Sequence, residues 1–230
     1  SIPVVIGEGD PAYNGVLEEI AAQNRSRLVY AENEFVCECQ EMHAEEQCFS
    51  LRRKRDGFLY AAELDLLGNY QRKNLVTAAT VADLLHESTP LTISRRAFLE
   101  GIRTAAESTS LGGRWQKIAD SPLTICDTGH NAHGLKYVVE QLAATPHRKL
   151  YCVMGIVRDK DLQEILHLLP TEGYYIFTEA QSQRAIPAEE LAQAAAAYGL
   201  QSMVVMWLLR ICGDSDNEIS EKSRGMRQLC

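Results

Sequence analysis

The sequence of residues 112–206 alternates short apolar runs with stretches of helical periodicity, and this alternation constrains the fold more than any other feature. It predicts strands at WQKIA, LTICDT, KLYCVMGI, YYIFTEA and QSMVVM, and helices near residues 133–144, 160–169 and 187–198. Because parallel strands need helical crossovers, the pattern predicts an α/β domain whose mostly parallel sheet is covered by helices.

The first sixty residues begin in the same way and then change. IPVVIG and RLVYAEN are predicted strands, with a helix between them. Residues 35–60 are rich in strand-forming runs around polar turns, and Arg55-Asp56-Gly57 suits a hairpin turn. We therefore expect a strand, helix, strand unit followed by β structure.

Two predicted helices follow and lead to a linker. From Asn69 the run NLVTAATVADLLHE places its apolar residues on one helical face, and Ser94 is positioned to cap a second helix, SRRAFLEGIRTAA. The small polar stretch STSLGGR then suits a linker. At 230 residues the chain exceeds the usual domain size of roughly 100 to 150 residues, so we place a boundary between two domains near Leu111 to Gly113.

Composition excludes some classes of protein. The formal net charge of −8 argues against a nucleic-acid binder, since phosphate backbones are bound by clustered Lys and Arg. No apolar run approaches the roughly 20 residues that span a bilayer, so no membrane association is expected. The first residues, SIPVVIGEGDPAYNG, lack a secretory signal and an initiator Met, so we expect a piece of a larger cytoplasmic chain.

The 7 cysteines show no CxxC spacing of the kind that zinc or redox sites favour. Cys37 and Cys39 alternate along one strand-like run, and a metal site there is the weaker alternative. Reduced, structural thiols are the prediction, and no metal-ligating residues are assigned.

Polar residues follow three of the predicted strands. The loop after LTICDT carries four of them, which are Asp127, His130, Asn131 and His133. Residues 157–160 follow LYCVMGI, and residues 178–184 follow YYIFTE. In open parallel sheets, ligands bind outside the carboxyl ends of the strands, so we expect the three loops to gather at one edge.

These loops resemble those of a known family. CDTGHNAHG is similar to the DGAHNPHG signature of folylpolyglutamate and dihydrofolate synthases in the Mur ligase superfamily, and GIVRDKD is similar to that family's next motif. Weaker similarities follow in the same order: IPVVIGEGDP, GNYQRKN, ISRRAFLEGI, GGRWQ and TEAQSQRAIPAEEL. The resemblance implies the end of a P-loop ATPase domain over residues 1–111, a Rossmann-like ligase domain over residues 112–206 and an atypical tail over residues 207–230, expected to be poorly ordered from about Cys212.

The resemblance also implies an activity. Such enzymes join the amino group of L-glutamate to folate, or to dihydropteroate, through an acyl phosphate made with ATP and Mg²⁺, and they are usually monomers. That chemistry requires phosphoryl transfer, stabilisation of the tetrahedral adduct and a closely held amine. The phosphate-cradling loop GxxGKGS is not in this sequence, so we expect the chain to resemble the carboxyl-terminal portion and to be inactive alone.

The resemblance assigns roles to individual residues. Contacts with ATP are implied for Asn74, Arg114 and Asp127. Catalytic roles are implied for His130, Asn131 and Lys160. Substrate binding is implied for His130, Asp159 and Arg184.

Each assignment has a structural alternative. Asp127 could cap the helix that starts near residue 133, and Asn74 could cap its own helix. Arg114 could be a solvated linker charge, and His130 and His133 could be exposed loop histidines. Two other functions also stay open, a Mur-type peptidoglycan ligase and a catalytically silent Rossmann-like binding module.

Overall fold

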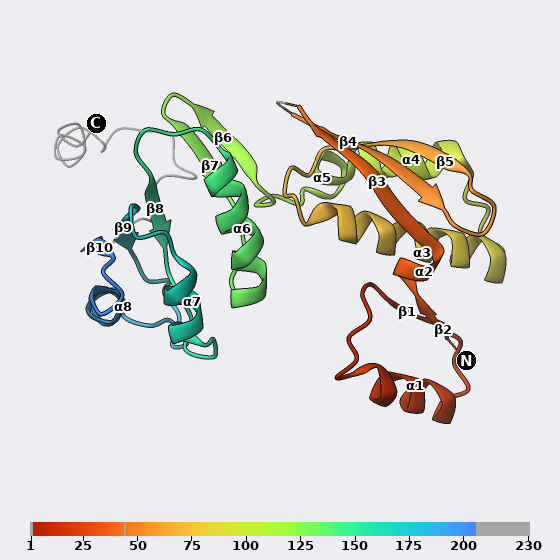
Figure 1. Cartoon of the computed structure of the whole chain (residues 1–230), viewed down its shortest axis with the longest axis horizontal. Coiled ribbons are helices and arrows are strands. Elements are labelled where there is room, and N and C mark those ends of the chain that lie inside the picture. Colours follow the sequence, from red (N-terminus) through yellow and green to blue (C-terminus); the bar gives the residue numbers. More distant parts are fainter. Residues whose placement is uncertain (1, 44, 206–230) are drawn as a thin grey trace. The chain divides into compact units, whose positions relative to one another are not determined.

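The computed structural model describes residues 2–43 and 45–205 (Figure 1). Its contacts divide the chain into two compact units, Ser1–Gly129 with Lys136–Ala144, and His130–Leu135 with the chain from Thr145 onward. The predicted tail over residues 207–230 lies outside the described residues. Within the described part, no helix combines the length and the apolar character that crossing a membrane requires.

The first unit begins with a small parallel pair of strands. Strand β1 (Val4–Ile6) pairs with β2 (Leu28–Tyr30), and helix α1 (Asn14–Gln23) is the crossover between them. A short helix, α2 (Ala31–Glu34), then leads into the next sheet. The predicted strand, helix, strand order is confirmed.

An antiparallel sheet of three strands follows. Strand β4 (Gln47–Arg53) lies between β3 (Phe35–Met42) and β5 (Leu59–Leu64). The turn from β4 to β5 contains Gly57 at φ +72°, a conformation that suits glycine, and the Asp56 carboxylate accepts the Phe58 N–H at 3.1 Å. The predicted hairpin turn at residues 55–57 is confirmed.

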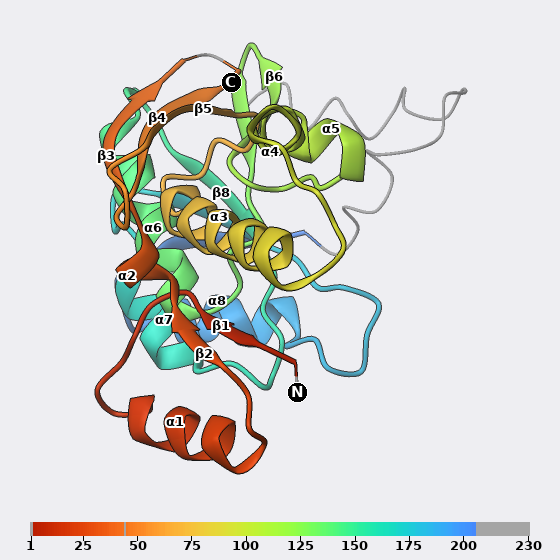
Figure 2. The same ribbon diagram turned by 90° about the vertical axis from the view of Figure 1, so that its right-hand side faces the viewer.

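Two helices cover one face of this sheet (Figure 2). Helix α3 (Gln71–Ser88) packs against β3, and α4 (Arg95–Arg103) packs against β5. Their shared core includes a set of buried apolar side chains, Phe35, Phe49, Leu51, Ala62, Leu64, Leu75, Ala79 and Ile102.

The ends of helix α4 show one prediction confirmed and one corrected. Ser94 caps the helix as predicted, because its Oγ accepts the Ala97 N–H at 3.1 Å. The helix predicted over SRRAFLEGIRTAA is instead broken at Thr104, and α5 (Ala105–Thr109) follows it. The Asp65 carboxylate accepts the Ala106 N–H at 2.8 Å from across the core, so a distant side chain caps the new helix.

Strand β7 (Leu123–Cys126), predicted as part of the parallel sheet, pairs elsewhere in the described structure. It forms an antiparallel hairpin with β6 (Gln116–Asp120). Only residues 121 and 122 separate the two strands, and so short a connection permits antiparallel pairing alone. Helix α6 (Ala132–Ala144) follows the hairpin.

The second unit has the predicted parallel architecture. Strands β8 (Tyr151–Met154), β9 (Tyr174–Phe177) and β10 (Gln201–Val204) are parallel and lie in the order β10-β9-β8. Helices α7 (Leu162–Leu168) and α8 (Ala188–Ala196) are the crossovers. The buried core of this unit includes Ile165, Leu166, Tyr175, Phe177, Leu191 and Ala195. The α/β class is confirmed.

Gly155, directly after β8, is required by a close approach to the neighbouring strand. A Cβ on this residue would lie 2.7 Å from the Thr178 carbonyl oxygen. We expect Gly155→Ala to lower the free energy of unfolding by roughly 1 to 3 kcal/mol through overpacking. Gly101→Ala, within α4 and with nothing near its Cβ, should raise the free energy by about 0.5 to 1 kcal/mol. Urea denaturation measures both, and equal effects would contradict this reading of Gly155.

Candidate active site

The carboxylate of Asp127, at the end of β7, is the most constrained acidic group of the candidate site. Its Oδ2 accepts the Tyr70 hydroxyl at 3.0 Å and the Trp115 backbone N–H at 2.8 Å. Its Oδ1 accepts the Gly129 backbone N–H at 2.7 Å. A carboxylate has about four acceptor positions, so roughly one stays open to a ligand.

Residues 113–115, directly before β6, have an unusual backbone conformation that places the Trp115 N–H at Asp127. Trp115 has φ +56°, a left-handed conformation that is uncommon outside glycine, and its indole is buried at 6% exposure. Gly113, at φ +70°, lies so close to Thr128 that a Cβ would collide with that side chain. The Thr128 N–H donates to the Gly113 carbonyl at 2.9 Å, which ties this segment to the loop after β7.

Tyr70, at the start of α3, reaches Asp127 from the other side of this segment. Desolvation by burial, together with the negative charge of Asp127 and the hydrogen bond to it, raises the pKa of the Tyr70 hydroxyl above its ordinary value. Gly68 permits the ring to fold back, since a Cβ there would lie 2.5 Å from the ring. The phenol is therefore held as a neutral donor.

Two buried glutamines hold the loop that carries Tyr70. The Gln47 side-chain amide donates to the Leu66 carbonyl, and to the Gly68 carbonyl at 3.2 Å. Gln141, from α6, donates to the Leu67 carbonyl at 2.9 Å, and its Oε1 accepts the Asn69 N–H at 2.8 Å. The backbone of residues 66–69 is therefore bound from both sides by side chains.

The first turns of α3 carry further polar contacts. Lys73 Nζ lies 2.8 Å from Glu8 Oε1 and donates to the Tyr137 hydroxyl at 2.7 Å. The hydrogen bonds to Glu8 and to Tyr137 raise the pKa of Lys73. Asn74 donates to the Gln71 side chain at 2.8 Å and lies within α3. It is therefore not the helix cap, and the structural alternative for Asn74 is wrong.

Arg114 lies beside the Asp127 loop. Its Nη1 donates to Thr128 Oγ1 and, at 3.1 Å, to the Gly113 carbonyl. Its own carbonyl accepts the Leu67 N–H at 3.1 Å. The residue is half-buried, so the alternative of a freely solvated linker charge does not describe it.

Asn131, rather than Asp127, caps helix α6. The Asn131 Oδ1 accepts the Gly134 N–H at 2.7 Å, three residues along. Asp127 binds Tyr70 and the N–H groups of Trp115 and Gly129 instead, and α6 begins only at Ala132, so the capping alternative for Asp127 is wrong. His130 is exposed on this loop, whereas His133 is exposed in the first turn of α6, so the alternative of a loop histidine is wrong for His133.

The second unit brings the other three predicted residues together. Arg184 Nη2 lies 2.6 Å from Asp159 Oδ2, and Lys160 Nζ lies 3.9 Å from the same oxygen. The Arg158 N–H donates to the Arg184 carbonyl at 2.8 Å, which joins the loops after β8 and β9. Desolvation alone would raise the pKa of Asp159. The hydrogen bonds that its carboxylate accepts from the Asp159 N–H and from Arg184 outweigh this effect and lower the pKa.

Three further residues shape the site and were not predicted from the sequence, Tyr70, Gln47 and Gln141. Tyr70 was visible, because it lies inside the motif GNYQRKN beside Asn74. Gln141 could also have been noticed, because in the sequence it interrupts the apolar positions of α6. In the structure its side chain is buried, with 4% exposed. Gln47 left none, because its strand gives no reason to expect a buried amide.

Comparison with known proteins defines the class. Residues 113–214 match the family model of the Mur ligase glutamate ligase domain. Residues 113–214 are therefore similar to a Mur ligase glutamate ligase domain.

Individual proteins of known function are similar to larger parts of the chain. The chain is 26% identical to folylpolyglutamate synthase of Lacticaseibacillus casei over 190 residues, 81% of this chain and 43% of that protein. It is 31% identical to dihydrofolate synthase/folylpolyglutamate synthase of Escherichia coli over 119 residues, 50% of this chain and 27% of that protein. The chain is similar to these folylpolyglutamate and dihydrofolate synthases, and it spans less than half the length of these two.

Solved structures show the same fold. Mycobacterium tuberculosis folylpolyglutamate synthase complexed with ADP matches with a TM-score of 0.73 at 23% identity, over 88% of this chain and 44% of that one. The Thermotoga maritima folylpolyglutamate synthase matches with a TM-score of 0.66 at 24% identity, over 89% of this chain and 47% of that one.

The raised pKa of Tyr70 predicts a dependence of stability on pH. In the unfolded chain the phenol ionises near its ordinary pKa of 10.0, while in the folded chain it stays protonated to higher pH. Its contribution to stability is therefore complete below pH 10 and is lost as pH rises above 10. We expect the free energy of unfolding to fall more steeply above that pH than it does in Tyr70→Phe. Denaturant titrations across this range measure the difference, and parallel curves would contradict it.

Proposed function

We propose that this chain is part of an ATP-dependent amide ligase that joins the amino group of L-glutamate to a carboxylate of folate or dihydropteroate through an acyl phosphate. The observation that carries the proposal is the fixed carboxylate of Asp127, held by three hydrogen bonds and adjoined by Arg114 through Thr128. Preorganised polar groups of this kind are typical of sites that position a substrate.

On the nucleotide side, Asp127 is the group that would accept ribose. Three of its roughly four acceptor positions are filled, so it would take about one hydroxyl rather than two. The Arg114 guanidinium would neutralise phosphate charge, and the amide of Asn74 would meet the adenine edge. The M. tuberculosis relative was solved with ADP, which supports a nucleotide as the ligand of this segment.

The chain fits the nucleotide only in part. The sequence contains no glycine-rich phosphate loop. Residues 2–43 and 45–205 contain no group of three His, Cys, Asp or Glu that could hold Mg²⁺. A segment beyond these residues would have to supply the phosphate cradle and the metal ligands, and we propose that the chain alone does not turn over ATP.

On the ligase side, the loops after β8 and β9 would hold the acidic substrates. Lys160 and Arg184 are cations that could bind a carboxylate, although Arg184 is paired with Asp159 and a ligand must compete for it. The exposed His130 would face the glutamate and the acyl phosphate, and Asn131 would act beside it. We further propose that the parent protein works as a cytoplasmic monomer.

A charge-removing variant tests the role of Asp127. In a protein that restores a phosphate loop upstream of residue 1, we expect Asp127→Asn to lower kcat/KM for ATP by roughly 10- to 100-fold, the effect of losing a hydrogen bond to a charged group. Glutamate-dependent ADP release with a folate or dihydropteroate acceptor is the measurement.

Two controls make this result specific. Asp120→Asn, on β6 with its side chain 82% exposed beside Lys117, should leave kcat/KM unchanged. An analogue of ATP without ribose hydroxyls should show a much smaller difference between Asp127→Asn and the unchanged protein. If no acceptor supports ADP release, the ligase proposal fails. If ADP release occurs but Asp127→Asn is silent, only the role of Asp127 fails.

Asn131 requires a separate test because it caps α6. Asn131→Asp keeps an oxygen that can cap the helix, whereas Asn131→Ala removes it and should lower stability by about 1 kcal/mol. A catalytic amide predicts that both variants lose ligase activity, while a pure cap predicts that Asn131→Asp stays active. Thermal unfolding and ADP release, measured on the same samples, separate the two roles.

A further inference from the structure

The first unit contains a second concave site that shares no residue with the Asp127 network. A cavity of about 330 Å³ lies between the start of β5 and helices α3 and α4. Its lining comprises Phe35, Arg53, Phe58, Tyr60, Ala79, Ala82, Asp83, His86, Ile93, Ser94, Arg95 and Phe98. The volume lies within the range of small-molecule sites, roughly 300 to 1,000 Å³.

One wall of the cavity is aromatic. The rings of Phe58 and Tyr60 are 4.8 Å apart at an interplanar angle of 73°, and Tyr60 meets Phe98 at 6.2 Å. Phe58 is 39% exposed, so part of its side chain is accessible to a ligand beside the Arg95 guanidinium that lies over the ring. A wall of this kind favours a flat ring, which can stack or meet the aromatic edges.

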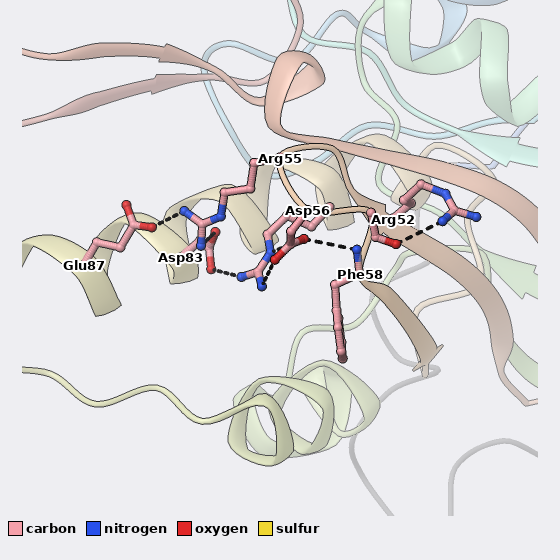
Figure 3. A network of polar contacts seen from close by, with 8 residues as sticks. Arg52, Arg55, Asp56, Phe58, Asp83 and Glu87 are labelled. Carbon is pink, nitrogen blue, oxygen red and sulfur yellow. Dashed lines mark hydrogen bonds and ion pairs between the residues drawn. The ribbon is translucent and has the colours of Figure 1, made fainter.

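The acidic group at the rim is already neutralised. Asp83 Oδ1 is 3.0 Å from Arg53 and Asp83 Oδ2 is 2.9 Å from Arg55, so both of its oxygens are occupied. Arg53 also binds Asp56 at 2.7 Å, and Arg55 binds Glu87 (Figure 3). This network holds the turn before β5 against α3 and leaves Asp83 unable to bind a cationic ligand without breaking an ion pair.

Arg95 differs from these arginines. Its Cζ lies 4.7 Å from the Phe58 ring centroid and 5.6 Å from that of Tyr60, and within the described residues it has no ion pair. The His86 Nδ1 accepts the Ile93 N–H at 3.2 Å, so the neutral imidazole carries its proton on Nε2. The cavity therefore offers two donor groups beside an aromatic wall.

We propose that this cavity binds a small aromatic carboxylate, with its ring against Phe58 and Tyr60 and its carboxylate on the Arg95 guanidinium. One planar guanidinium matches a single carboxylate in both geometry and charge, and His86 supplies a further donor. This inference does not depend on the ligase proposal, because none of the residues involved belongs to that site.

The probe is 4-fluorobenzoate, titrated into the 230-residue chain and followed by fluorine and amide NMR. We expect saturable binding with a dissociation constant of about 1 mM, which is ordinary for so small a ligand, and shifts at Phe58 and Tyr60. Arg95→Gln should weaken binding at least tenfold. Arg96→Gln, the next residue on α4 and outside the cavity lining, should leave binding unchanged.

Two further probes separate ring from charge. Benzamide keeps the ring and lacks the negative charge, whereas cyclohexanecarboxylate keeps the charge and lacks the aromatic face, and both should bind at least tenfold more weakly. Arg95 is exposed, and an unchanged amide spectrum would verify that Arg95→Gln is folded. Absence of saturable binding, equal affinity of the three probes, or equal effects of Arg95→Gln and Arg96→Gln would each overturn the proposal.

Discussion

The binding of the backbone at residues 66–69 by two glutamines is the constraint from which the geometry of the candidate active site follows. Gln47 and Gln141 bind three carbonyls and one N–H of a loop that has no regular structure of its own. An unpaired buried polar group costs roughly 1 to 3 kcal/mol, so losing either amide would free this loop to move. Tyr70 directly follows the loop, and through Tyr70 the position of Asp127 depends on it.

The charged side chains fall into two groups with different roles. Arg53 and Arg55 form ion pairs with Asp56, Asp83 and Glu87. These pairs stabilise the packing of the turn before β5 on α3. Arg114 instead binds a hydroxyl and a carbonyl, and it forms no ion pair within the described part of the chain. Neutral partners position the guanidinium without cancelling its charge. The positive charge of Arg114 would therefore be available to a phosphate.

Sequence periodicity predicted the elements that are decided locally. The helix from Asn69 appears as α3, and the cap at Ser94 and the hairpin turn at residues 55–57 are where the residue types indicate. The α/β class of the second half follows for the same reason, since apolar runs and helical faces alternate along it.

Partners distant in sequence could not be predicted in this way. The Tyr70 to Asp127 hydrogen bond joins residues 57 positions apart, and the Asn69 to Gln141 bond joins residues 72 positions apart. Strand β7 was predicted in the parallel sheet because apolar content predicts a strand but not the strand with which it pairs. The short turn after β6 determines that β7 pairs with β6. The residue that caps α6 also depends on where the helix starts, and its start at Ala132 makes Asn131 the cap while Asp127 binds other donors.

The left-handed backbone at Trp115 has a consequence for how this segment can change over evolutionary time. Glycine would relax such a conformation, but it would also empty the space that the indole fills, because Trp115 is 6% exposed. Smaller β-branched residues would combine both penalties. Substitution of Trp115 is therefore disfavoured both by the backbone conformation and by the loss of packing. The bulk of the indole thus preserves the position of the backbone N–H that donates to Asp127.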